Sequence, residues 1–503
     1  MSMLQSKHLI AGAWVDAEDR FENQPVEGPA DSFAAGSDAL VYQAVRAAEE
    51  AFWTFGYSTR AARAAFLRAI ADEIEVRGDA ITAMGTKETG LPTARLEGER
   101  GRTTGQLRYF AEAIEAGDYL DRTHDAALPD RAPLPRPDLR LMQRPIGPVA
   151  VFGASNFPLA FSTAGGDTAA ALAAGCPVVV RGHPAHPGVS DLVAQAIDAA
   201  IKACDMPAGV FSLIQGGPLE VGAALVQHPL IKAVGFTGSL RGGRALFDLC
   251  AARPEPIPFF GELGSVNPMF LLPELLASKA QATAEGWAAS LTMGAGQFCT
   301  NPGVVVMIKS EGADTFLQAA ETALAEVAPQ VMLTDGISQA YAAGQSKISG
   351  ADNVTSVVAG EAGPRCAAPS LATVAASDWL ADDTLADEVF GPFGLVVVCE
   401  NAEEMLAVAK GLHGQLTCTL HLVSGDEALA QNLMPILEHK AGRVLANGFP
   451  TGVEVCDAMM HGGPYPASTN FGATSVGAMS IRRFLRAVSY QNLPDALIPQ
   501  DLL

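Results

Sequence analysis

Residues 148–181 read PVAVFGASNFPLAFSTAGGDTAAALAAGCPVVVR and contain the pattern that decides the fold. A short apolar run at 148–152 leads through a turn into an Ala-rich helical segment at 162–174. A second apolar run follows at 177–181. Short apolar runs separated by a helix are typical of buried parallel strands in βαβ units. The stretch therefore predicts an α/β domain with a parallel sheet.

The same alternation extends in both directions along the chain. Helical and apolar segments continue in turn at 189–203, 210–215, 219–227, 233–236 and 240–252. Further candidate strands lie at 269–272, 304–308, 395–398 and 417–422, and residues 8–16 resemble a hairpin. We expect two doubly wound parallel-sheet domains that join near 255–262. The Pro-rich segment at 127–137 cannot lie inside a helix, and the strand-like tail at 480–503 could pair with this excursion.

The composition describes a folded, acidic protein and excludes several classes of function. The 503 residues include 33 Lys and Arg against 55 Asp and Glu, a formal net charge of −22, and 49% of them are hydrophobic. Such a chain buries large cores and exceeds the usual size of one domain. Its acidity opposes general binding to nucleic acids or anionic membranes, so we expect neither partner.

The eight cysteines are scattered through the chain. None forms a Cys-x-x-Cys pair or a Cys/His cluster with zinc-site spacing, so the sequence predicts no metal. Their mostly apolar neighbours are typical of reduced thiols. No apolar run approaches the roughly 20 residues of a membrane-spanning helix, and the first residues lack the pattern of a secretion signal. We expect a cytoplasmic protein without a transmembrane segment.

Two Gly-rich turns carry side chains suited to covalent chemistry. Cys299 lies in GAGQFCTNPG (294–303), where a ligand can approach the backbone, and is a candidate nucleophile. Glu262 lies in FGELGSVNP (260–268), where apolar surroundings would raise its pKa and suit it to act as a base. The plainer alternatives are a small buried thiol and a loop carboxylate that accepts from a backbone N–H.

Two further turns follow predicted strands. Asn156, in GASNFP (153–158), could donate its amide to a developing oxyanion or could bond its own backbone. Ser239, in GFTGS (235–239), could help to present N–H groups to a cofactor phosphate or could simply cap the helix at 240–252. The G-x-G-x-x-G fingerprint of dinucleotide binding is missing.

In this order and spacing the motifs resemble the aldehyde dehydrogenase superfamily. The matching pieces extend over nearly the whole chain and are Gly153–Pro158, Phe236–Ser239, Glu262–Gly264, Gly296–Cys299 and Glu388–Pro392. Three further stretches, GGDTAAALAAGCP (165–177), HPAHPG (183–188) and HGGPYP (461–466), are similar to one branch. That branch contains 2,5-dioxopentanoate (α-ketoglutarate semialdehyde) dehydrogenases and an NADP-preferring fatty-aldehyde dehydrogenase.

The resemblance implies an α/β fold with two doubly wound parallel-sheet domains and a small strand arm for oligomerisation. It assigns residues 1–126 and 145–257 to an NAD(P)-binding domain, 258–478 to a catalytic domain, and 127–144 and 479–503 to the arm. It also implies a homodimer or homotetramer that acts on a small-molecule aldehyde.

The resemblance further implies oxidation of an aldehyde to a carboxylic acid. Cys299 would form a thiohemiacetal and then a thioester, while Asn156 and the Cys299 backbone N–H hold the oxyanion. Glu262 would activate the water that hydrolyses the thioester. Glu388 would hold the nicotinamide ribose, with Phe390 beside the ring. The other implied cofactor contacts lie in one turn and are Phe236, Thr237, Gly238 and Ser239.

Two positions depart from the family pattern. Arg181 stands where most members have a lysine that contacts the adenosine ribose. Because the planar guanidinium suits a 2′-phosphate, we expect NADP to be preferred, with NAD as the alternative cofactor and a solvated strand end as the plainer interpretation. Ser265 replaces the second glycine of the usual Glu-Leu-Gly-Gly and could change how the Glu262 loop moves.

An aldehyde that carries a carboxylate needs a cation in its pocket. Arg102 and Arg108 are candidates because their helix flanks the substrate tunnel in the family, although both could be solvated helix residues. Phe298 and Trp287 are candidate lining residues, or plain core. We expect oxidation of 2,5-dioxopentanoate to 2-oxoglutarate. The alternatives are an NADP-dependent dehydrogenase of medium- or long-chain aldehydes, a thiol esterase that needs no cofactor, and a catalytically silent binding subunit.

Overall fold

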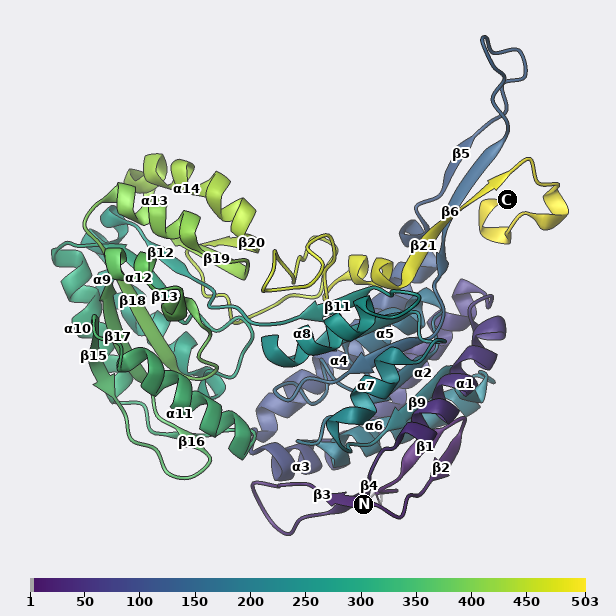
Figure 1. The fold of residues 1–503 in the computed structure, drawn as a ribbon, viewed down its shortest axis with the longest axis horizontal. Coiled ribbons are helices and arrows are strands. Elements are labelled where there is room, and N and C mark those ends of the chain that lie inside the picture. The colour runs from purple at the N-terminus through teal and green to yellow at the C-terminus, as the bar shows by residue number, and fades with distance from the viewer. Residues whose placement is uncertain (1–3) are drawn as a thin grey trace.

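The computed structural model describes residues 4–503, and Figure 1 shows two α/β lobes with a strand arm that extends from the first. The first lobe contains a seven-stranded sheet. From edge to edge its strands are β11 (Phe259–Glu262), β10 (Ala233–Thr237), β7 (Val149–Phe152), β8 (Val178–Arg181), β9 (Phe211–Ile214), β1 (His8–Ile10) and β2 (Ala13–Val15). The strands from β11 to β9 are parallel, and β1 and β2 form the predicted hairpin.

Helices connect the parallel strands of this first sheet in chain order. They are α5 (Gly166–Ala174), α6 (Pro187–Ala203), α7 (Leu219–Gln227) and α8 (Leu240–Ala251). The chain builds β7, β8 and β9 towards one side and then returns, so that β10 pairs with the free side of β7. Ligands bind outside the carboxyl ends of the strands at such a topological switch point. The fold therefore places a ligand crevice at the ends of β7 and β10.

The second lobe is built on another seven-stranded sheet. Its strands are β15 (Val354–Ala359), β17 (Ser370–Ala375), β18 (Phe393–Cys399), β13 (Val304–Ile308), β12 (Met269–Leu271), β19 (Gln415–His421) and β20 (Ala441–Ala446). All neighbours are parallel except β15, which runs antiparallel to β17. The accompanying helices are α9 (Pro273–Thr292), α10 (Glu311–Ala325), α11 (Asp335–Ser349), α12 (Ala376–Ala381), α13 (Ala402–Gly411) and α14 (Glu427–Lys440).

The arm is a three-stranded antiparallel sheet. Its order is β21 (Leu485–Gln491), β6 (Leu139–Pro145) and β5 (Thr123–Asp125). The tail thus pairs with the strand that follows the Pro-rich segment, which confirms the predicted pairing. Two short pairs complete the strands, β3 (Arg20–Glu22) with β4 (Ser32–Ala34) and β14 (Gln330–Val331) with β16 (Cys366–Ala367).

The position of β11 differs from the predicted division of the chain. The sequence places a domain boundary between residues 257 and 258, whereas β11 begins at Phe259 and pairs with β10 in the first sheet. Glu262, its last residue, is therefore held by the first lobe. The physical reason is that a short apolar strand at the end of a βαβ series completes the parallel sheet that precedes it.

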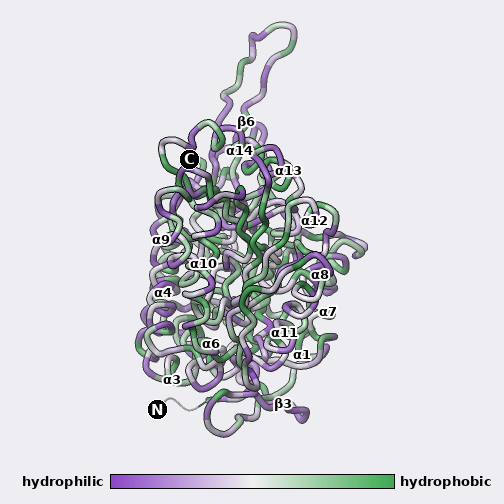
Figure 2. Tube along the Cα trace, turned by 90° about the vertical axis from the view of Figure 1, so that its left-hand side faces the viewer, coloured by the Kyte–Doolittle hydropathy of each residue, from purple (hydrophilic) through white to green (hydrophobic). Residues whose placement is uncertain are grey.

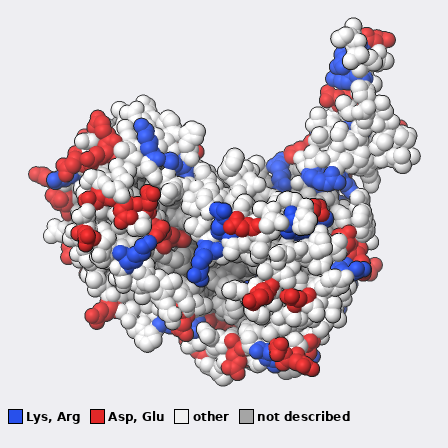
Figure 3. Space-filling view, viewed as in Figure 1, with Lys and Arg blue, Asp and Glu red and all other residues white. Residues whose placement is uncertain are grey.

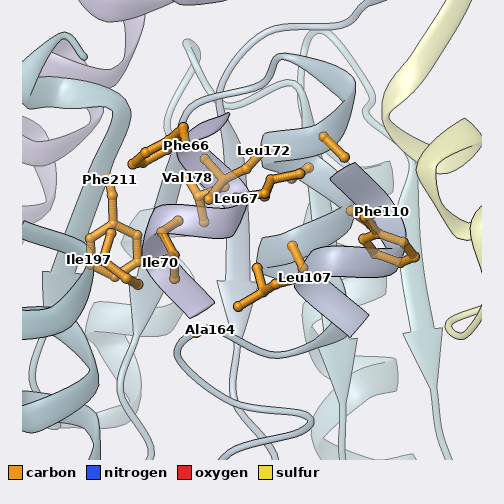
Figure 4. Packing of buried hydrophobic residues seen from close by; sticks show 14 of the residues in the cluster. Phe66, Leu67, Ile70, Leu107, Phe110, Ala164, Leu172, Val178, Ile197 and Phe211 are labelled. Carbon is orange, nitrogen blue, oxygen red and sulfur yellow. The ribbon is translucent and has the colours of Figure 1, made fainter. Parts of the chain in front are cut away.

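Of the four helices near the N-terminus, α1 (Asp38–Phe55) packs on strands of the first sheet, whereas α2 (Arg60–Val76), α3 (Gly78–Thr89) and α4 (Thr93–Ala116) pack mainly on α5, α6 and one another. Phe66 and Ile70, four residues apart on α2, lie on one helix face because 3.6 residues make a turn. Figure 4 shows them packed with Leu107 and Phe110 of α4 and with Val178 of β8, and all five are fully buried. Each such side chain contributes roughly 1.5–3 kcal/mol through burial, which holds α4 firmly against the domain.

Trp287, a candidate lining residue, belongs to the core of the second lobe. It is fully buried, its ring lies 5.7 Å from that of Phe316, and its Nε1–H donates to the Pro302 carbonyl at 2.9 Å. A Cβ on Gly394 would lie 2.5 Å from the indole, so that glycine of β18 leaves room for the ring. The interpretation of Trp287 as core is therefore the correct one.

The hydropathy of the chain follows this layered arrangement. In Figure 2 apolar segments run through the interior and polar segments lie largely outside. Figure 3 shows acidic side chains spread over both lobes on one face, with basic side chains among them. Within residues 4–503, no helix is both long enough and apolar enough to cross a membrane.

Candidate active site

The carboxyl edge of the first sheet carries several of the predicted site residues. Glu262 ends β11 and Arg181 ends β8, while Asn156 lies in the turn after β7. Thr237 is paired with Glu262 across β10 and β11, so these two strand ends lie side by side. The Gly153–Pro158 turn therefore opens at the same edge as the Phe236–Ser239 turn.

The amino edge of the second sheet carries the other half of the site. Cys299 precedes β13 and Glu388 precedes its parallel neighbour β18 by the same number of residues, so both loops lie at one edge. Their backbones touch, because a Cβ on Gly296 would lie 2.4 Å from the Gly391 carbonyl carbon. Gly296 also has φ +64°, a conformation that glycine adopts without strain.

Cys299, His461 and Glu262 form a cluster of side chains where the two lobes meet, with His461 Nε2 in contact with both of the others. Cys299 Sγ lies 3.5 Å from His461 Nε2, which lies 2.8 Å from Glu262 Oε1. The other carboxylate oxygen accepts from Ser475 Oγ at 2.7 Å. Glu262 and His461 are buried and Cys299 is half-buried, so the thiol stays open to a substrate.

The pKa of Glu262 differs from the sequence expectation. Burial acts to raise it, but the charge and hydrogen bond of His461 and the hydroxyl of Ser475 outweigh burial and lower the pKa. The expectation of a raised pKa was wrong because these partners come from a distant part of the chain. Since the ionised carboxylate only accepts hydrogen bonds, His461 Nε2 carries the proton in this pair.

The Cys299 thiol has its pKa raised well above the ordinary value. Loss of water around the sulfur is the first cause, followed by the charges of Glu262 and Glu388. The protonated thiol is therefore the resting form, with a carboxylate and an imidazole beside it. A nucleophile of this kind needs a neighbouring base to take its proton when it reacts.

Asn156 lies beside the Cys299 loop. Its Nδ2 donates to the Gln297 carbonyl at 3.0 Å, and the side chain is buried. The amide group carries a second N–H besides the one in this bond. The loop is fixed from behind by Asn267, whose Nδ2 donates to the carbonyls of Cys299 and Asn301 at 2.9 Å each. Asn267 was not predicted.

Ser265, the departure from Glu-Leu-Gly-Gly, ties the Glu262 segment to the second sheet. Its Oγ donates to Gln415 Oε1 at 2.8 Å and accepts from the Leu416 backbone N–H at 3.0 Å. Gln415 begins β19. The hydroxyl therefore anchors the segment that follows Glu262, a role that the family pattern did not indicate.

In the turn after β10, Ser239 has the plainer of its two predicted roles, that of a helix cap. Ser239 Oγ accepts from the Gly242 backbone N–H at 3.2 Å and caps α8. Phe236, Thr237 and Gly238 are half-buried at the end of the strand, and Ser239 is exposed. The first turn of α8 lies beside the switch-point crevice, where helix N–H groups favour an anion.

Arg181 and Glu388 are two predicted cofactor residues with different surroundings. Arg181 Nη2 donates to the Gly217 carbonyl at 3.1 Å, and within residues 4–503 its buried Nε has no partner. Glu388 lies beside the Ser265 backbone, and a Cβ on Gly264 would lie 2.9 Å from its Oε2. Crowding by protein and the charge of Glu262 raise the pKa of Glu388 to about 8, although its surface is open to solvent.

These two side chains fit the cofactor that the sequence implies. An unpartnered guanidinium nitrogen at the end of β8 suits a phosphate, and a carboxylate suits the hydroxyl groups of a ribose. Phe390 lies near Glu388, and both line a small cavity together with Phe298. The residues present can therefore hold a dinucleotide.

Arg102 interacts electrostatically with the Cys299 thiol. Its Nη1 donates to the Val453 carbonyl, its guanidinium lies 5.6 Å from the centre of the Phe161 ring, and its buried Nη2 has no partner among the described residues. Burial lowers its pKa, against a favourable interaction with Cys299. Arg108, by contrast, is partly exposed and pairs with Asp72 at 2.8 Å.

A second cation near Cys299, Arg443 of β20, was missed by sequence reasoning. It donates Nη1 to the Gly452 carbonyl at 2.7 Å and Nη2 to the Pro450 carbonyl at 2.6 Å. Partial burial lowers its pKa, again against an interaction with Cys299. Arg102 and Arg443 thus contact one loop, residues 450–453. No motif signals such an arginine, because strand and loop meet only in the fold.

Phe298 lies directly before the nucleophile and is buried. Its ring centre lies 5.6 Å from that of Phe157 in an edge-to-face arrangement. The guanidinium of Arg95 lies 5.4 Å from the Phe298 ring centre. Phe298 therefore forms an apolar wall between α4 and the Cys299 loop.

Comparison with known proteins identifies close relatives of the chain. The aldehyde dehydrogenase family profile matches residues 14–487. Alpha-ketoglutaric semialdehyde dehydrogenase 2 of Azospirillum brasilense is 51% identical, over 99% of this chain and 96% of that protein. Alpha-ketoglutaric semialdehyde dehydrogenase of Acinetobacter baylyi is 48% identical, over 92% and 88%. Among solved structures, betaine aldehyde dehydrogenase of Staphylococcus aureus has a TM-score of 0.83 at 21% identity, covering 98% of this chain and 96% of that one.

Proposed function

The chain belongs to the aldehyde dehydrogenase family, and from that premise we propose that it oxidises 2,5-dioxopentanoate to 2-oxoglutarate. The observation that carries the substrate is a pair of buried guanidinium nitrogens, on Arg102 and Arg443, that have no partner among the described residues and whose charges act on Cys299. The names of the two relatives at 51% and 48% identity support the same substrate. Aldehyde dehydrogenases use NAD or NADP, and the groups at the crevice fit either.

The reaction begins at the Cys299 thiol. The sulfur attacks the aldehyde carbon, a C–S bond forms, and the carbonyl oxygen takes the negative charge. The thiol proton passes to the neighbouring Glu262 carboxylate, which His461 and Ser475 hold in place. Asn156 and the Cys299 backbone N–H donate to the oxyanion.

The second half of the reaction releases the acid. A bound NAD or NADP would supply the hydride acceptor, and loss of the hydride from the former aldehyde carbon would leave a thioester on Cys299. Glu388 and Phe390 would hold the nicotinamide side of the cofactor. Glu262 first releases the thiol proton to solvent and then takes a proton from water, so that the water oxygen adds to the thioester. The C–S bond breaks, the carboxylic acid leaves, and Glu262 returns its proton to the sulfur.

The two guanidiniums would bind the carboxylate at the far end of the substrate. Arg102 Nη2 and Arg443 Nε are buried and lack a partner among residues 4–503. A buried donor without a partner is costly, and a carboxylate would satisfy both atoms. A plain alkyl aldehyde would leave them unpaired, which supports the dioxo acid over medium- or long-chain aldehydes.

We propose NADP as the preferred cofactor. Arg181 lies at the end of β8 with a free Nε, and its side chain is held by the Gly217 carbonyl. A 2′-phosphate beside it would gain charge-assisted hydrogen bonds that the 2′-hydroxyl of NAD cannot match. Phe236, Thr237, Gly238 and Ser239 complete the proposed cofactor contacts.

Steady-state kinetics with 2,5-dioxopentanoate and with hexanal, each with NADP and NAD, test the proposal. We expect the highest kcat/KM for the dioxo acid with NADP. Arg102→Met should raise KM for the dioxo acid at least tenfold, because a charge-assisted hydrogen bond contributes roughly 1.5–3 kcal/mol, and should leave KM for hexanal nearly unchanged. Arg100→Met, on the same helix but paired with Glu75, is the matched control. A preference of the wild type for hexanal would refute the substrate.

Arg108→Met distinguishes the two predicted arginines. Its guanidinium already pairs with Asp72, so we expect a smaller effect on the dioxo acid than for Arg102→Met. An equal or larger effect would assign the carboxylate to Arg108 instead.

The Cys299–His461–Glu262 cluster favours ester hydrolysis as a second activity of the same site. A thiol with an adjacent base can attack an activated ester, and Glu262 can direct water to the resulting thioester. Hydrolysis of p-nitrophenyl acetate without cofactor measures this activity. Hydrolysis that exceeds aldehyde oxidation for every aldehyde tried would make the chain an esterase.

We also propose that the protein is a cytoplasmic homodimer or homotetramer. All eight cysteines are free, as expected in a reducing compartment. β21 is an edge strand of the arm, and an unpaired edge is commonly covered by a partner chain. Light scattering coupled to size exclusion measures the mass, and a monomer at micromolar concentration would contradict the proposal.

A further inference from the structure

We propose that Cys299, His461 and Glu262 also form a binding site for a soft divalent cation, above all Zn²⁺, which blocks the enzyme reversibly. One ligand atom from each of the three residues lies within 4.8 Å of the others. Within residues 4–503, this is the one group of three or more His, Cys, Asp and Glu side chains that converges in this way. The site goes beyond dehydrogenation, although it uses the same side chains.

The spacing of the atoms fits tetrahedral zinc. Bonds of about 2.3 Å to sulfur and about 2.1 Å to nitrogen at a tetrahedral angle separate the two atoms by roughly 3.6 Å. Cys299 Sγ and His461 Nε2 are 3.5 Å apart. Glu262 Oε1 lies 2.8 Å from Nε2, so the carboxylate needs to move back by only about half an ångström to reach the spacing of two zinc ligands.

The charges of the site match a divalent cation. A thiolate and a carboxylate contribute two negative charges and the imidazole contributes none, so bound Zn²⁺ makes a neutral group in a largely enclosed place. Binding releases the Cys299 proton, and the neutral imidazole binds the metal through Nε2 with its own proton on Nδ1. In exchange, three polar groups gain bonds to the metal.

Outer hydrogen bonds already orient the ligands. Ser475 Oγ donates to Glu262 Oε2 at 2.7 Å, which leaves Oε1 for the metal. The His461 backbone N–H donates to Thr474 Oγ1 at 2.9 Å. Hydrogen bonds to metal-binding residues fix the geometry of the ligands and raise metal affinity. The half-buried side of Cys299 leaves the fourth position for water.

The ligand set selects among metals. Thiolate and imidazole favour Zn²⁺, Co²⁺ and other softer ions, whereas Mg²⁺ requires oxygen ligands in octahedral geometry. A bound ion occupies the sulfur and the base together. Aldehyde addition and water activation then both stop, so the metal would compete with the aldehyde.

Cobalt titration of the full chain, free of metal, aldehyde and cofactor, tests the site directly. We expect one Co²⁺ per chain with a thiolate-to-cobalt charge-transfer band and tetrahedral d–d bands, displaced by Zn²⁺ and unaffected by Mg²⁺. Cys299→Ser should remove the charge-transfer band and weaken binding at least about 100-fold, since loss of a direct ligand exceeds the roughly 10–100-fold effect of losing a hydrogen bond to a ligand. Cys204→Ser and Cys366→Ser, two other cysteines that are not fully buried, should bind like the wild type.

His461→Gln tests the imidazole, with circular dichroism to check folding. It should weaken Co²⁺ binding by a similar factor. A wild-type measurement stands independently of any variant: Zn²⁺ should protect Cys299 from alkylation by iodoacetamide, as read by peptide mass spectrometry, and EDTA should restore both alkylation and turnover. Absence of the thiolate band, or unaltered alkylation of Cys299 in Zn²⁺, would overturn the site. Neither result depends on which aldehyde is the substrate.

Discussion

The two seven-stranded sheets resemble each other in construction but face the active site with opposite edges. The first sheet presents the carboxyl ends of β7, β8, β10 and β11. The second presents loops that precede β13 and β18, at its amino edge. Figure 1 shows the two lobes side by side, with β11 of the first lobe near the connection between them. The carboxyl edge follows the general rule for ligand sites in open α/β sheets, and the amino edge does not.

This difference between the sheets shows which residues each sheet contributes to the proposed site. In the proposed mechanism, each edge supplies one residue for covalent chemistry and one for the cofactor. From the first sheet these are Glu262 and Arg181, and from the second they are Cys299 and Glu388. Neither sheet holds a complete site, so removing each residue in turn measures what its edge contributes.

Cys299→Ala should have the largest effect. We expect kcat to fall by at least about four orders of magnitude, because no other nucleophile adjoins the base. Cofactor binding, measured by quenching of protein fluorescence, should persist since the first sheet remains intact. Turnover within a factor of ten of the wild type would show that the second sheet does not supply the nucleophile.

Glu262→Gln should have the next largest effect. The amide cannot accept a proton, so we expect kcat to fall by about 10²–10³, the usual range for general base catalysis. Rapid mixing should still show a burst of reduced cofactor, because water activation is slowed more than hydride loss. Glu262→Asp, which keeps the charge, should recover part of the rate. If the variant showed no burst, Glu262 would be needed to activate the thiol and not only to activate water.

The sequence predicted the carboxyl edge of the first sheet better than the contacts between the lobes. Asn156, Arg181 and Glu262 follow apolar runs, and periodicity locates such positions. His461 lies 162 residues from Cys299 and 199 from Glu262, and no spacing rule connects them. The direction of the Glu262 pKa shift was predicted wrongly for the same reason. Apolar neighbours along the chain indicate burial of Glu262, whereas the hydrogen-bond partners that lower its pKa lie far away in the sequence.

Two other parts of the fold show the same contrast between local sequence patterns and contacts of distant segments. The Pro-rich segment and the apolar tail indicated the arm, because proline excludes helix and alternation favours a strand. The loop at 450–453 shows no pattern, yet both Arg102 and Arg443 donate to its carbonyls. Contacts made by irregular loops depend on packing, which a single sequence does not encode locally.

Glu388→Gln tests the cofactor residue at the amino edge of the second sheet. The raised pKa means that part of the Glu388 population is protonated near neutrality. Since ribose hydroxyls donate to a carboxylate, cofactor affinity should rise with pH and level off above about 8. Because Glu388 also contacts solvent, the midpoint of this pH dependence should lie between the ordinary pKa of a carboxyl group and about 8. The wild type should therefore bind cofactor more tightly at pH 8.5 than at pH 6, by about threefold to tenfold.

In Glu388→Gln this pH dependence of cofactor affinity should disappear, and KM for the cofactor should rise about tenfold. Isothermal titration at several pH values measures both. A wild type whose affinity falls with increasing pH would show that the protonated carboxyl donates instead.

Arg181→Lys should have the smallest effect and concerns the carboxyl edge of the first sheet. Lysine keeps the charge but loses the planar fork, and it cannot reach the Gly217 carbonyl and a phosphate at the same time in the way that Arg181 can. We expect the ratio of kcat/KM for NADP over NAD to fall by about threefold to tenfold, with kcat nearly constant, because the residue lies far from the sulfur in the reaction geometry. Arg241→Lys, in the first turn of α8, provides a matched control at the same crevice. If Arg241→Lys changes the ratio and Arg181→Lys does not, the 2′-phosphate is held by the helix rather than by the end of β8, and the first sheet contributes to the cofactor only through its turns.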